Sequence, residues 1–435
     1  MAFVSVVLIV RNQLPGQSPS VVAESSSHYF HHQLQSFRSF LSNPSSRNAN
    51  GSNGSRQRNS SQGMVSSSGV IGAARASAAK GSNSSRAGQP QGLREEQRHV
   101  FFLKVHKAAS TTVLNVLCRF ALQRHLNVML PKNVNILSES SKNWGSAAVA
   151  LPPGVPRFDM LFNHLVFNEQ LIRQNLYPDS KFIGIVREPL SQSVSAFRYY
   201  RQMFKLSYLV RIPGPDPLVT YLQSPEAWDH SNLAFSFTHN RMSFDFGMDN
   251  GGLMGNPKRI ADYVTYLNRT FDLVMVSERF DESMVLLKRL LGWRLQDVIY
   301  IKSNVFSATA AVASRHTKVA SRPVHQYNFT EEQRQRHRKF NAADYALYEH
   351  FSKLFQQRVE AQGQTFAEEV AAFKSLLQQV AQFCMVDTQG HAVTLTATKW
   401  SDTFQVRRSD CVLMATPEQE LVSMKRREQL GRYVG

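Results

Sequence analysis

The apolar and polar residues of this 435-residue chain are distributed unevenly, and the distribution changes near residue 98. Residues 11–97 are rich in Ser, Asn, Gln, Gly and Arg and contain few apolar residues. Such a segment buries too little apolar surface to offset the entropy lost on ordering, so we expect a disordered stem. Together with a short apolar run at its start, this stem occupies residues 1–97, and one folded domain occupies residues 98–435.

Four apolar runs in the folded part are each followed by a pattern typical of a helix. The expected strands span residues 100–105, 160–164, 181–186 and 272–276. The helices expected after them span residues 111–124, 168–174, 191–204 and 281–291, with a further helix at 257–268. Because strands that alternate with helices form parallel sheets, the pattern predicts an α/β fold with a central parallel sheet flanked by helices.

The last third of the chain has the spacing of long helices instead. Thr330-Glu331-Glu332-Gln333 is a capping-box pattern that opens a helix. Apolar residues then recur every three to four positions over residues 342–361 and 366–383, which is typical of amphipathic helices. Beyond Cys384 the pattern is irregular, so we expect a helical C-terminal part with an irregular end.

Charge and cysteine content narrow the class of protein. The formal net charge of +18 favours anionic partners, such as a nucleotide, an acidic or sulfated glycan, a nucleic acid or a membrane surface. Three cysteines exclude a disulfide scaffold and a four-cysteine zinc site. Cys384 and Cys411 could form a disulfide or remain two free thiols, whereas Cys118 lies on an apolar helix and is expected to be buried.

Membrane association is only weakly indicated by the pattern. A run of about 20 apolar residues, as a transmembrane helix needs, is not found in the sequence. The apolar residues 1–10 are compatible with the remnant of a signal anchor or signal peptide, or with a plain apolar N-terminus. Glycosylation sequons, which are compatible with a lumenal protein, occur at Asn50, Asn53, Asn59, Asn83, Asn268 and Asn328.

The apolar run at 100–105 ends in a short polar loop, and a helix is expected to begin directly after it. The loop contains His106 and Lys107, and the hydroxyls of Ser110, Thr111 and Thr112 stand near the start of the helix. Backbone N–H groups and the helix dipole favour an anion there, and a lysine adds a positive charge. The glycines of a Walker A loop are missing, which argues against an ordinary NTPase. The simpler alternative is a polar loop with a Ser or Thr cap.

Two further candidates follow other expected strands. Arg187 comes directly after the run at 181–186, and Ser195 lies eight positions later on the next helix. Ligands of open α/β sheets bind at the carboxyl ends of strands, so these two side chains could share one phosphate. The alternative is a surface Arg–Glu pair and a solvent-facing serine. His164 ends the run at 160–164 and is a candidate general base, although a structural role is the simpler interpretation for a lone histidine.

Taken together, these motifs resemble those of the galactose 3-O-sulfotransferases, a family of Golgi carbohydrate sulfotransferases. The resemblance covers residues 98–435 and rests on segments that occur in a fixed order. These segments are Lys104–Thr112, Asn163-His164, Arg187–Ser195, Phe244–Asn250, Phe271–Ser283, Leu286–Leu291, Leu295–Tyr300, Gly390–Val393 and Thr416–Glu418.

The resemblance implies a P-loop-like sulfotransferase fold and the cofactor 3′-phosphoadenosine-5′-phosphosulfate (PAPS), without a metal. Arg187 and Ser195 would bind the 3′-phosphate, which distinguishes this cofactor from ATP. Lys107 would stabilise the departing oxygen and His164 would accept the proton of the acceptor, so these are the expected catalytic residues. The residues expected to hold the 5′-phosphosulfate end are Lys104, His106, Lys107, Ala109, Ser110, Thr111 and Thr112.

The implied reaction is the transfer of a sulfuryl group to the 3-hydroxyl of a terminal galactose on glycolipids or glycoproteins. The family also implies a lumenal catalytic domain held at the Golgi membrane, over residues 98–435, and no nucleic-acid partner. Ala108 departs from the family, which usually has Thr there, and the usual N-terminal anchor is not evident. His239, Asn240 and Arg241 are candidates for contacts with the sugar. The alternatives are a sulfotransferase for a uronyl or amino sugar and a non-enzymatic polyanion-binding protein.

Overall fold

The computed structural model describes residues 95–132, 136–139, 147–248, 251–301, 327–387 and 390–432. Residues 1–94, which make up most of the expected stem, lie outside the described residues. The centre of the fold is a sheet of four parallel strands in the order β2-β1-β3-β4. The strands are β1 (Val100–Phe102), β2 (Met160–Leu161), β3 (Lys181–Val186) and β4 (Leu273–Val276). The predicted α/β class is therefore confirmed.

Two of the strands are shorter than the apolar runs that predicted them. β1 ends at Phe102 although the apolar run continues to Val105. Leu103 and Val105 are fully buried, so the run extends beyond the strand into a buried loop. β2 likewise has two residues, and the apolar residues after it are buried without joining the sheet. An apolar pattern reports burial, and here burial continues past the hydrogen-bonded ladder.

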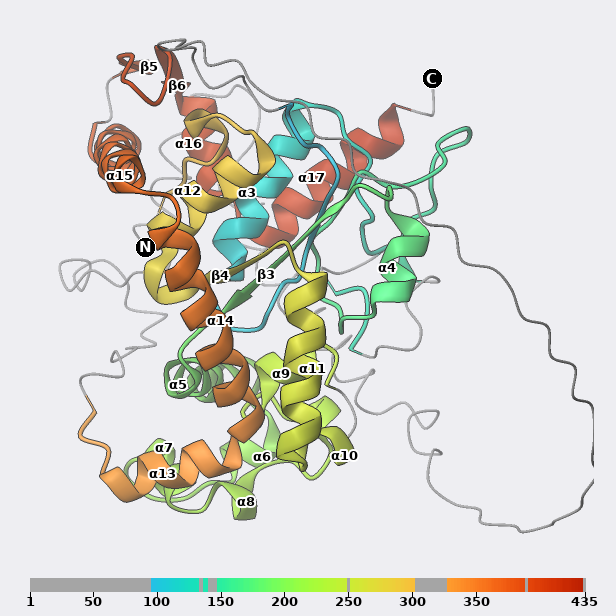
Figure 1. Ribbon diagram of the computed structural model, residues 1–435, viewed down its shortest axis with the longest axis vertical. Helices are drawn as coiled ribbons and strands as arrows, with labels where there is room; N and C mark the ends of the chain where they lie inside the picture. The colour runs from blue at the N-terminus through green and yellow to red at the C-terminus, as the bar shows by residue number, and fades with distance from the viewer. Residues whose placement is uncertain are drawn as a thin grey trace, which may run out of the picture.

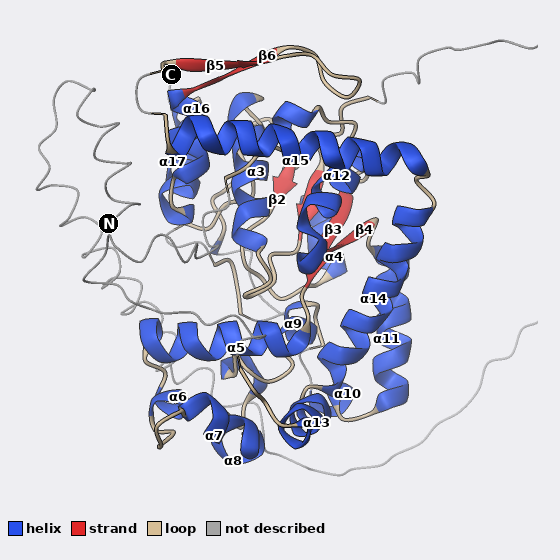
Figure 2. Ribbon diagram, turned by 90° about the vertical axis from the view of Figure 1, so that its left-hand side faces the viewer, coloured by secondary structure: helices blue, strands red, loops and turns tan. Residues whose placement is uncertain are grey.

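A helix follows each strand of the sheet, as the alternating pattern predicted. These helices are α3 (Ser110–Gln123), α4 (Glu169–Asn175), α5 (Pro189–Tyr199) and α12 (Phe280–Leu291). α5 continues into a π-helical turn, η3 (Tyr200–Phe204), and a short 3₁₀ turn, η5 (Ser277–Arg279), precedes α12. Figure 2 shows β2, β3 and β4 in the middle of the molecule, with α3 and α17 (Glu418–Gly431) on one side. The helices α11 (Pro257–Thr270) and α14 (Ala342–Glu360) lie on the other side.

The sheet has a topological switch point between β1 and β3. From β1 the chain moves to β2 on one side, whereas from β3 it moves to β4 on the other. The loops that leave the carboxyl ends of β1 and β3 therefore lie next to each other. Open parallel sheets bind ligands at such a point, so the fold brings two of the predicted motifs to one place.

A helical segment between β3 and β4 carries a second apolar cluster, which includes Phe197, Tyr200, Tyr221 and Phe237. Its short elements are α6 (Ser207–Val210), α7 (Pro217–Gln223), α8 (Pro225–Trp228), η4 (Leu233–Phe235), α9 (Arg241–Asp245) and α10 (Gly251–Met254). Of these, α7 packs against α5, and both α7 and α8 pack against α13 (Glu331–Phe340). The longer helix α11 (Pro257–Thr270) follows and packs against α14.

The C-terminal part is helical, as expected, but its end is more regular than the sequence indicated. A 3₁₀ turn, η6 (Leu295–Asp297), precedes α13 (Glu331–Phe340), which opens with the predicted capping box on Thr330. Beyond Cys384, where no regular pattern was found, a hairpin and two helices are present. The remaining elements are α14 (Ala342–Glu360), α15 (Gln364–Met385), β5 (Ala392–Leu395), β6 (Phe404–Arg407), α16 (Arg408–Ala415) and α17 (Glu418–Gly431).

The two cysteines of the C-terminal part form a disulfide that joins α15 to α16. Cys118 is a free, buried thiol on α3, as predicted. α17 returns to the sheet region and packs along α3 (Figure 1). Among the described helices, none is both long and apolar enough to cross a membrane.

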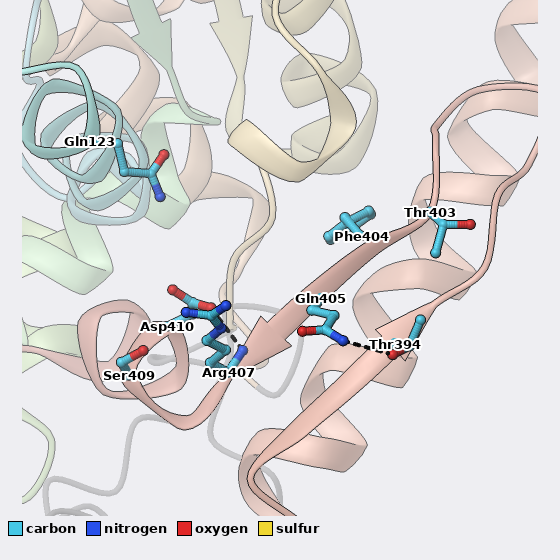
Figure 3. A pocket seen from close by; sticks show the side chains of 8 residues that line it. All are labelled: Gln123, Thr394, Thr403, Phe404, Gln405, Arg407, Ser409 and Asp410. Atoms are coloured by element: carbon cyan, nitrogen blue, oxygen red, sulfur yellow. Dashed lines mark hydrogen bonds between the residues drawn. The ribbon is translucent and has the colours of Figure 1, made fainter.

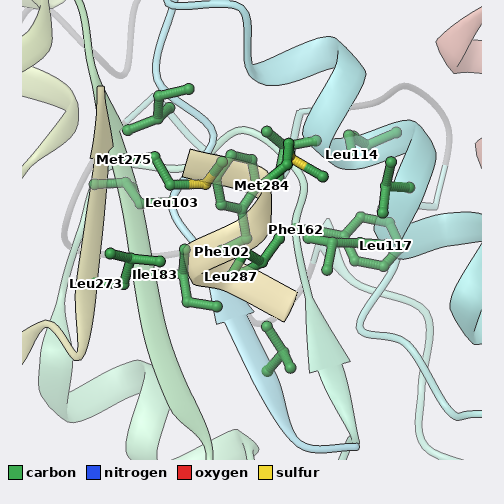
Figure 4. Close-up of a cluster of buried hydrophobic side chains, with 14 of the residues drawn as sticks. Phe102, Leu103, Leu114, Leu117, Phe162, Ile183, Leu273, Met275, Met284 and Leu287 are labelled. Carbon is green, nitrogen blue, oxygen red and sulfur yellow. The ribbon is translucent and has the colours of Figure 1, made fainter. Parts of the chain in front are cut away.

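The main hydrophobic core lies between the sheet and the helices α3 and α12. Figure 4 shows side chains of β1, β3 and β4 meeting Leu114 and Leu117 of α3 and Met284 and Leu287 of α12. Burial of side chains of this size contributes about 1.5–3 kcal/mol each. The core therefore holds the carboxyl ends of the strands, and the first turn of α3, in a fixed position.

Candidate active site

The loop between β1 and α3 has an unusual backbone. Lys107 and Ala109 have φ angles of 59° and 62°, in the left-handed region that L-residues rarely adopt. Ala109 is the N-cap of α3, and no side chain caps the helix there. The first turn of α3 also contains no acidic residue. The N-terminal N–H groups and the positive end of the helix dipole therefore meet no acidic or capping side chain from the helix itself, as an anion site requires.

Two hydroxyls of this loop, those of Ser110 and Thr111, have hydrogen-bond partners within the protein. Ser110 donates its hydroxyl hydrogen bond to the carbonyl of Val105 at 2.7 Å and is buried, so this side chain closes the loop on itself. Thr111 donates to the carboxylate of Glu418 at 3.0 Å. Ala108 is fully buried, so its methyl group packs in the core. Ligand contacts of Ser110, Thr111, Thr112 and Ala109 remain predictions.

Lys107 and Arg187 are brought together by the switch point. A guanidinium nitrogen of Arg187 donates a hydrogen bond to the carbonyl of Lys107 at 2.8 Å. The ammonium of Lys107 lies 3.7 Å from the centre of the Tyr199 ring. Burial, and then the positive charges of Arg187 and Lys104, lower the pKa of Lys107 to about 8. Two positive groups thus lie side by side, where each would gain from an anionic ligand.

The helix that carries Ser195 starts directly behind Arg187. Glu188 caps α5 by accepting hydrogen bonds from the N–H groups of Leu190 and Ser191. Ser195 is the seventh residue of α5 and is partly buried. Burial lowers the pKa of Arg187, although Glu278 and Glu188 oppose this effect. The shared role of Arg187 and Ser195 in binding one phosphate remains a prediction.

His164 lies beside the loop, next to Lys104. The carbonyl of Lys104 accepts a hydrogen bond from Nδ1 of His164 at 2.8 Å, which fixes the proton of the neutral ring on Nδ1. Nε2 therefore carries the lone pair, and the ammonium of Lys104 lies 2.7 Å from it. Burial, followed by His106, Lys104 and Arg241, lowers the pKa of His164 well below its ordinary value. The ring is thus neutral at physiological pH and can accept a proton.

The ring of His106 stacks on the ring of His164, with the two centres 4.0 Å apart. Nδ1 of His106 donates to the carboxylate of Asp245 at 2.8 Å, and the same carboxylate accepts the backbone N–H of His106. Arg241 pairs with Asp245 at 3.0 Å and also with Glu139. All of these side chains are buried. The side chain of His106 thus has protein partners on both sides. Its predicted contact with the cofactor stays a prediction.

Three carboxylates of this site were not identified from the sequence. Glu139 lies in a stretch without a regular pattern, so no signal was available. Asp245 stands between Phe244 and Phe246, and a carboxylate among aromatic residues indicates a buried, paired charge. Glu418 opens α17, and its distance of more than 300 residues from Thr111 gave no reason to connect the two.

Arg241, suggested as a sugar contact, is used inside the protein instead. Its side chain is buried and pairs with Glu139 and Asp245. The neighbouring Asn240 is also buried, and its N–H donates to the side chain of Asn341. The ring of His239 stacks on Phe340. Arg241 and Asn240 are therefore better explained as a link between α9, α14 and the loop at His106.

A separate polar pocket of about 590 Å³ lies at the other end of α3 (Figure 3). The 14 residues of α3 separate it from the loop by about 20 Å, at 1.5 Å per residue. Its lining residues are Gln123, Thr394, Thr403, Phe404, Gln405, Arg407, Ser409 and Asp410. Within the described part of the chain, no cluster of three or more His, Cys, Asp or Glu side chains has the geometry of a metal site.

The fold is a parallel α/β fold, and the loop after β1 lies at the switch point of its sheet, where Arg187 contacts Lys107. The sequence model of the galactose-3-O-sulfotransferase family matches residues 68–413. The chain therefore belongs to the galactose-3-O-sulfotransferase family, and the resemblance identified from the motifs is confirmed. The matched span begins within the expected stem and ends before Glu418.

Known members of the family are similar over about two thirds of the chain. Mouse galactose-3-O-sulfotransferase 3 is 34% identical over 300 residues, which cover 68% of this chain and 65% of the relative. Human galactosylceramide sulfotransferase is 31% identical over 314 residues, 72% of this chain and 69% of the relative. Pig galactose-3-O-sulfotransferase 2 is 32% identical over 299 residues, which cover 66% of this chain and 69% of the relative. The chain thus spans about two thirds of the length of the relatives it matches.

Proposed function

We propose that this protein transfers a sulfuryl group from PAPS to the 3-hydroxyl of a terminal galactose on a glycolipid or glycoprotein. The observation that carries the proposal is the junction of Lys107, Arg187 and the uncapped start of α3 at the switch point of the sheet. His164, on the loop after the adjacent strand β2, supplies a neutral base beside it. Membership of the family supports the nature of the donor and of the acceptor.

The residues present fit a cofactor with two separate anionic groups. The N–H groups at the start of α3 and the ammonium of Lys107 would hold the 5′-phosphosulfate end. Arg187 has guanidinium nitrogens beyond the one bound to Lys107, and with Ser195 it would hold the 3′-phosphate. When bound, PAPS supplies the sulfuryl group and leaves as adenosine 3′,5′-bisphosphate. Because its pKa is about 8, the side chain of Lys107 is mostly protonated near neutral pH. The ammonium can therefore stabilise the negative charge that develops on the departing oxygen.

His164 would accept the proton of the acceptor hydroxyl at Nε2. Its Nδ1 proton is fixed by the carbonyl of Lys104, and the stacked ring of His106 limits its rotation. Asp245 in turn orients His106 through the Nδ1 hydrogen bond. The carbonyl of Lys104, His106 and Asp245 form a rigid support for one basic nitrogen, and such preorganisation is a main source of rate enhancement.

We further infer that the acceptor is a galactose-terminated glycolipid or glycan and that the protein works in the Golgi lumen in association with the membrane. The names of the relatives, galactosylceramide sulfotransferase among them, support this acceptor class. The net charge of +18 is compatible with a site near an anionic membrane surface.

A transfer assay with labelled PAPS and a panel of acceptors tests the proposal. We expect sulfate on galactosyl and lactosyl acceptors, and none on acceptors that lack a free galactose 3-hydroxyl. Lys107→Ala and Arg187→Ala should each lower the rate by about 100-fold or more, because each removes a charge from the cofactor site. Lys258→Ala, an exposed lysine on α11, is the matched control and should keep the full rate.

Two outcomes would overturn the proposal in different ways. Sulfate found on uronyl or amino sugars instead of galactose would assign the protein to another acceptor class. Binding of heparin with a steep salt dependence, together with no transfer and no affinity for adenosine 3′,5′-bisphosphate, would indicate a non-enzymatic polyanion-binding protein.

A further inference from the structure

The base in this site is already in contact with a cation. The ammonium of Lys104 lies 2.7 Å from Nε2 of His164, the nitrogen whose lone pair would receive the proton of the acceptor. Because Nδ1 donates to the carbonyl of Lys104, Nε2 is the only ring nitrogen of His164 that can act as a base. One lone pair cannot hold a lysine hydrogen bond and an incoming proton together. Lys104 must therefore move away from Nε2 before the acceptor hydroxyl can react.

The second partner of Lys104 is the carboxylate of Glu418. The ammonium and the carboxylate are 3.1 Å apart, and their side chains are 3% and 9% exposed. Water has little access to this pair, so a protein group must take the charge of Lys104 when it leaves His164. Glu418 is held in position by the hydroxyl of Thr111, which donates to the same carboxylate at 3.0 Å.

We propose that Glu418, on α17, is a positioning residue that draws Lys104 away from Nε2 of His164 and so makes the base available to the acceptor. The inference rests on the proposed function and adds to it a residue beyond the segment matched by the family model. In the transfer step, the acceptor O–H bond breaks and its proton goes to Nε2. An O–S bond forms to the acceptor oxygen, the bond from sulfur to the bridging oxygen breaks, and that oxygen leaves with the nucleotide. Lys104 stays with Glu418, away from the new imidazolium.

The charges around His164 explain why the position of Lys104 affects the protonation of this ring. Lys104 contacts the ring of His164, the positive charge of Arg241 also acts on that ring, and His106 stacks on it. Asp245 and Glu139 lie behind His106 and Arg241, where they neutralise Arg241. Glu418 is the carboxylate on the side of Lys104. Without it, a second proton on His164 would meet the unneutralised charge of Lys104, which disfavours the imidazolium.

Glu418 also acts on the cofactor site, where its negative charge is unfavourable for binding of an anionic nucleotide. Its negative charge raises the pKa of Lys107, so the carboxylate lies within electrostatic range of the phosphosulfate loop. A carboxylate there repels an anionic nucleotide. Loss of this charge should therefore slow the reaction without weakening nucleotide binding. A merely structural role would weaken both, because it would disturb the loop as a whole.

The test compares Glu418→Gln with Glu420→Gln, which removes a similar charge from an exposed position on the same helix. We expect Glu418→Gln to lower kcat about 10-fold or more. The Kd for adenosine 3′,5′-bisphosphate should be unchanged or lower, and Glu420→Gln should behave like the unsubstituted protein. In a Lys104→Met background, Glu418→Gln should change kcat less than about twofold, since Glu418 acts through Lys104.

An unchanged kcat in Glu418→Gln would overturn the inference, as would an equal loss with and without Lys104. A raised Kd that parallels the loss of kcat would indicate a structural role and would also overturn it. If Glu418→Gln does not fold, Glu418→Asp keeps the charge and takes its place, and the same dependence of its kcat loss on Lys104 is expected. Failure of the proposed function is distinct, because the unsubstituted protein would then transfer no sulfate.

Discussion

At the scale of single residues, the site is a small set of buried charges with opposing pKa shifts. Burial lowers the pKa of His164 and of Lys107. Burial also raises the pKa of Asp245 to about 6, although Arg241 and the N–H of His106 oppose this effect. Buried ionisable groups whose pKa values move in opposite directions are typical of catalytic sites.

Replacement of Lys104 should change the pH dependence of the reaction. The positive charge of Lys104 disfavours the imidazolium and is one cause of the low pKa of His164, after burial and His106. Lys104→Met removes that charge, so the pKa of His164 should rise. The base must be neutral to act, and the acidic limb of kcat/KM should therefore move to higher pH. A pH–rate profile of the variant checks this; a limb that stays in place or moves to lower pH would contradict it.

Nucleotide binding should weaken at alkaline pH because of Lys107. Its pKa of about 8 means that the ammonium loses its proton just above the physiological range. A bound anion raises this pKa, so the decline in affinity should begin above pH 8 and continue as the pH rises further. Titration calorimetry with adenosine 3′,5′-bisphosphate at several pH values measures the effect. In Lys107→Ala the affinity should be low at every pH, and an unchanged alkaline decline in that variant would assign the decline to another group.

Asp245 should matter for stability more than for binding. Its carboxylate pairs with Arg241 and accepts two hydrogen bonds from His106. Asp245→Asn leaves a buried guanidinium with Glu139 as its remaining carboxylate partner, which should cost about 3–5 kcal/mol of unfolding free energy. Denaturant unfolding measures this, with Asp262→Asn, exposed on α11, as the control. A loss below about 1 kcal/mol would show that Glu139 alone satisfies Arg241.

At the scale of elements, the sequence predicted those helices whose apolar spacing and caps lie within a single segment of the chain. α3, α5, α12, α14 and α15 were placed within a few residues, because their apolar spacing and caps lie within one segment. The capping box at Thr330 was recognised for the same reason. The hairpin β5–β6, with its mostly exposed strands, carries little apolar pattern and was missed. The role of α17 depends on its packing against α3, about 300 residues earlier, and no local signal reports such a contact.

The disulfide between α15 and α16 should stabilise this C-terminal part. It closes a loop with a sequence separation of 27 residues. By the chain-entropy model, a loop of this length is worth about 3.5 kcal/mol. Cys384→Ser combined with Cys411→Ser should lower the unfolding free energy by about that amount, as calorimetry under non-reducing conditions would measure. Cys118→Ser, at the free thiol, is not part of this effect, and equal sensitivity to reductant in the double variant and the unsubstituted protein would contradict the role of the disulfide.

At the scale of the whole molecule, the order of the strands creates the site. The sequence predicted separate motifs after three strands, and the sheet order β2-β1-β3-β4 places all three at one edge. Lys107 and Arg187 could be predicted as site candidates from motif and family resemblance, and the structure adds their contact through the carbonyl of Lys107. The roles of the carboxylates Glu139, Asp245 and Glu418 could not be predicted from the sequence, since each acts through partners that are far away in sequence.

The most direct test of the account is the thermal stability of the unsubstituted protein with adenosine 3′,5′-bisphosphate, compared with ADP and ATP. We expect the first nucleotide to raise Tm by several degrees, because a ligand at about 100 times its Kd stabilises by about 2.7 kcal/mol. ADP and ATP should raise it less, and Arg187→Ala should abolish the difference. An equal or larger shift with ADP or ATP would contradict the claim that the switch point holds a nucleotide by its 3′-phosphate.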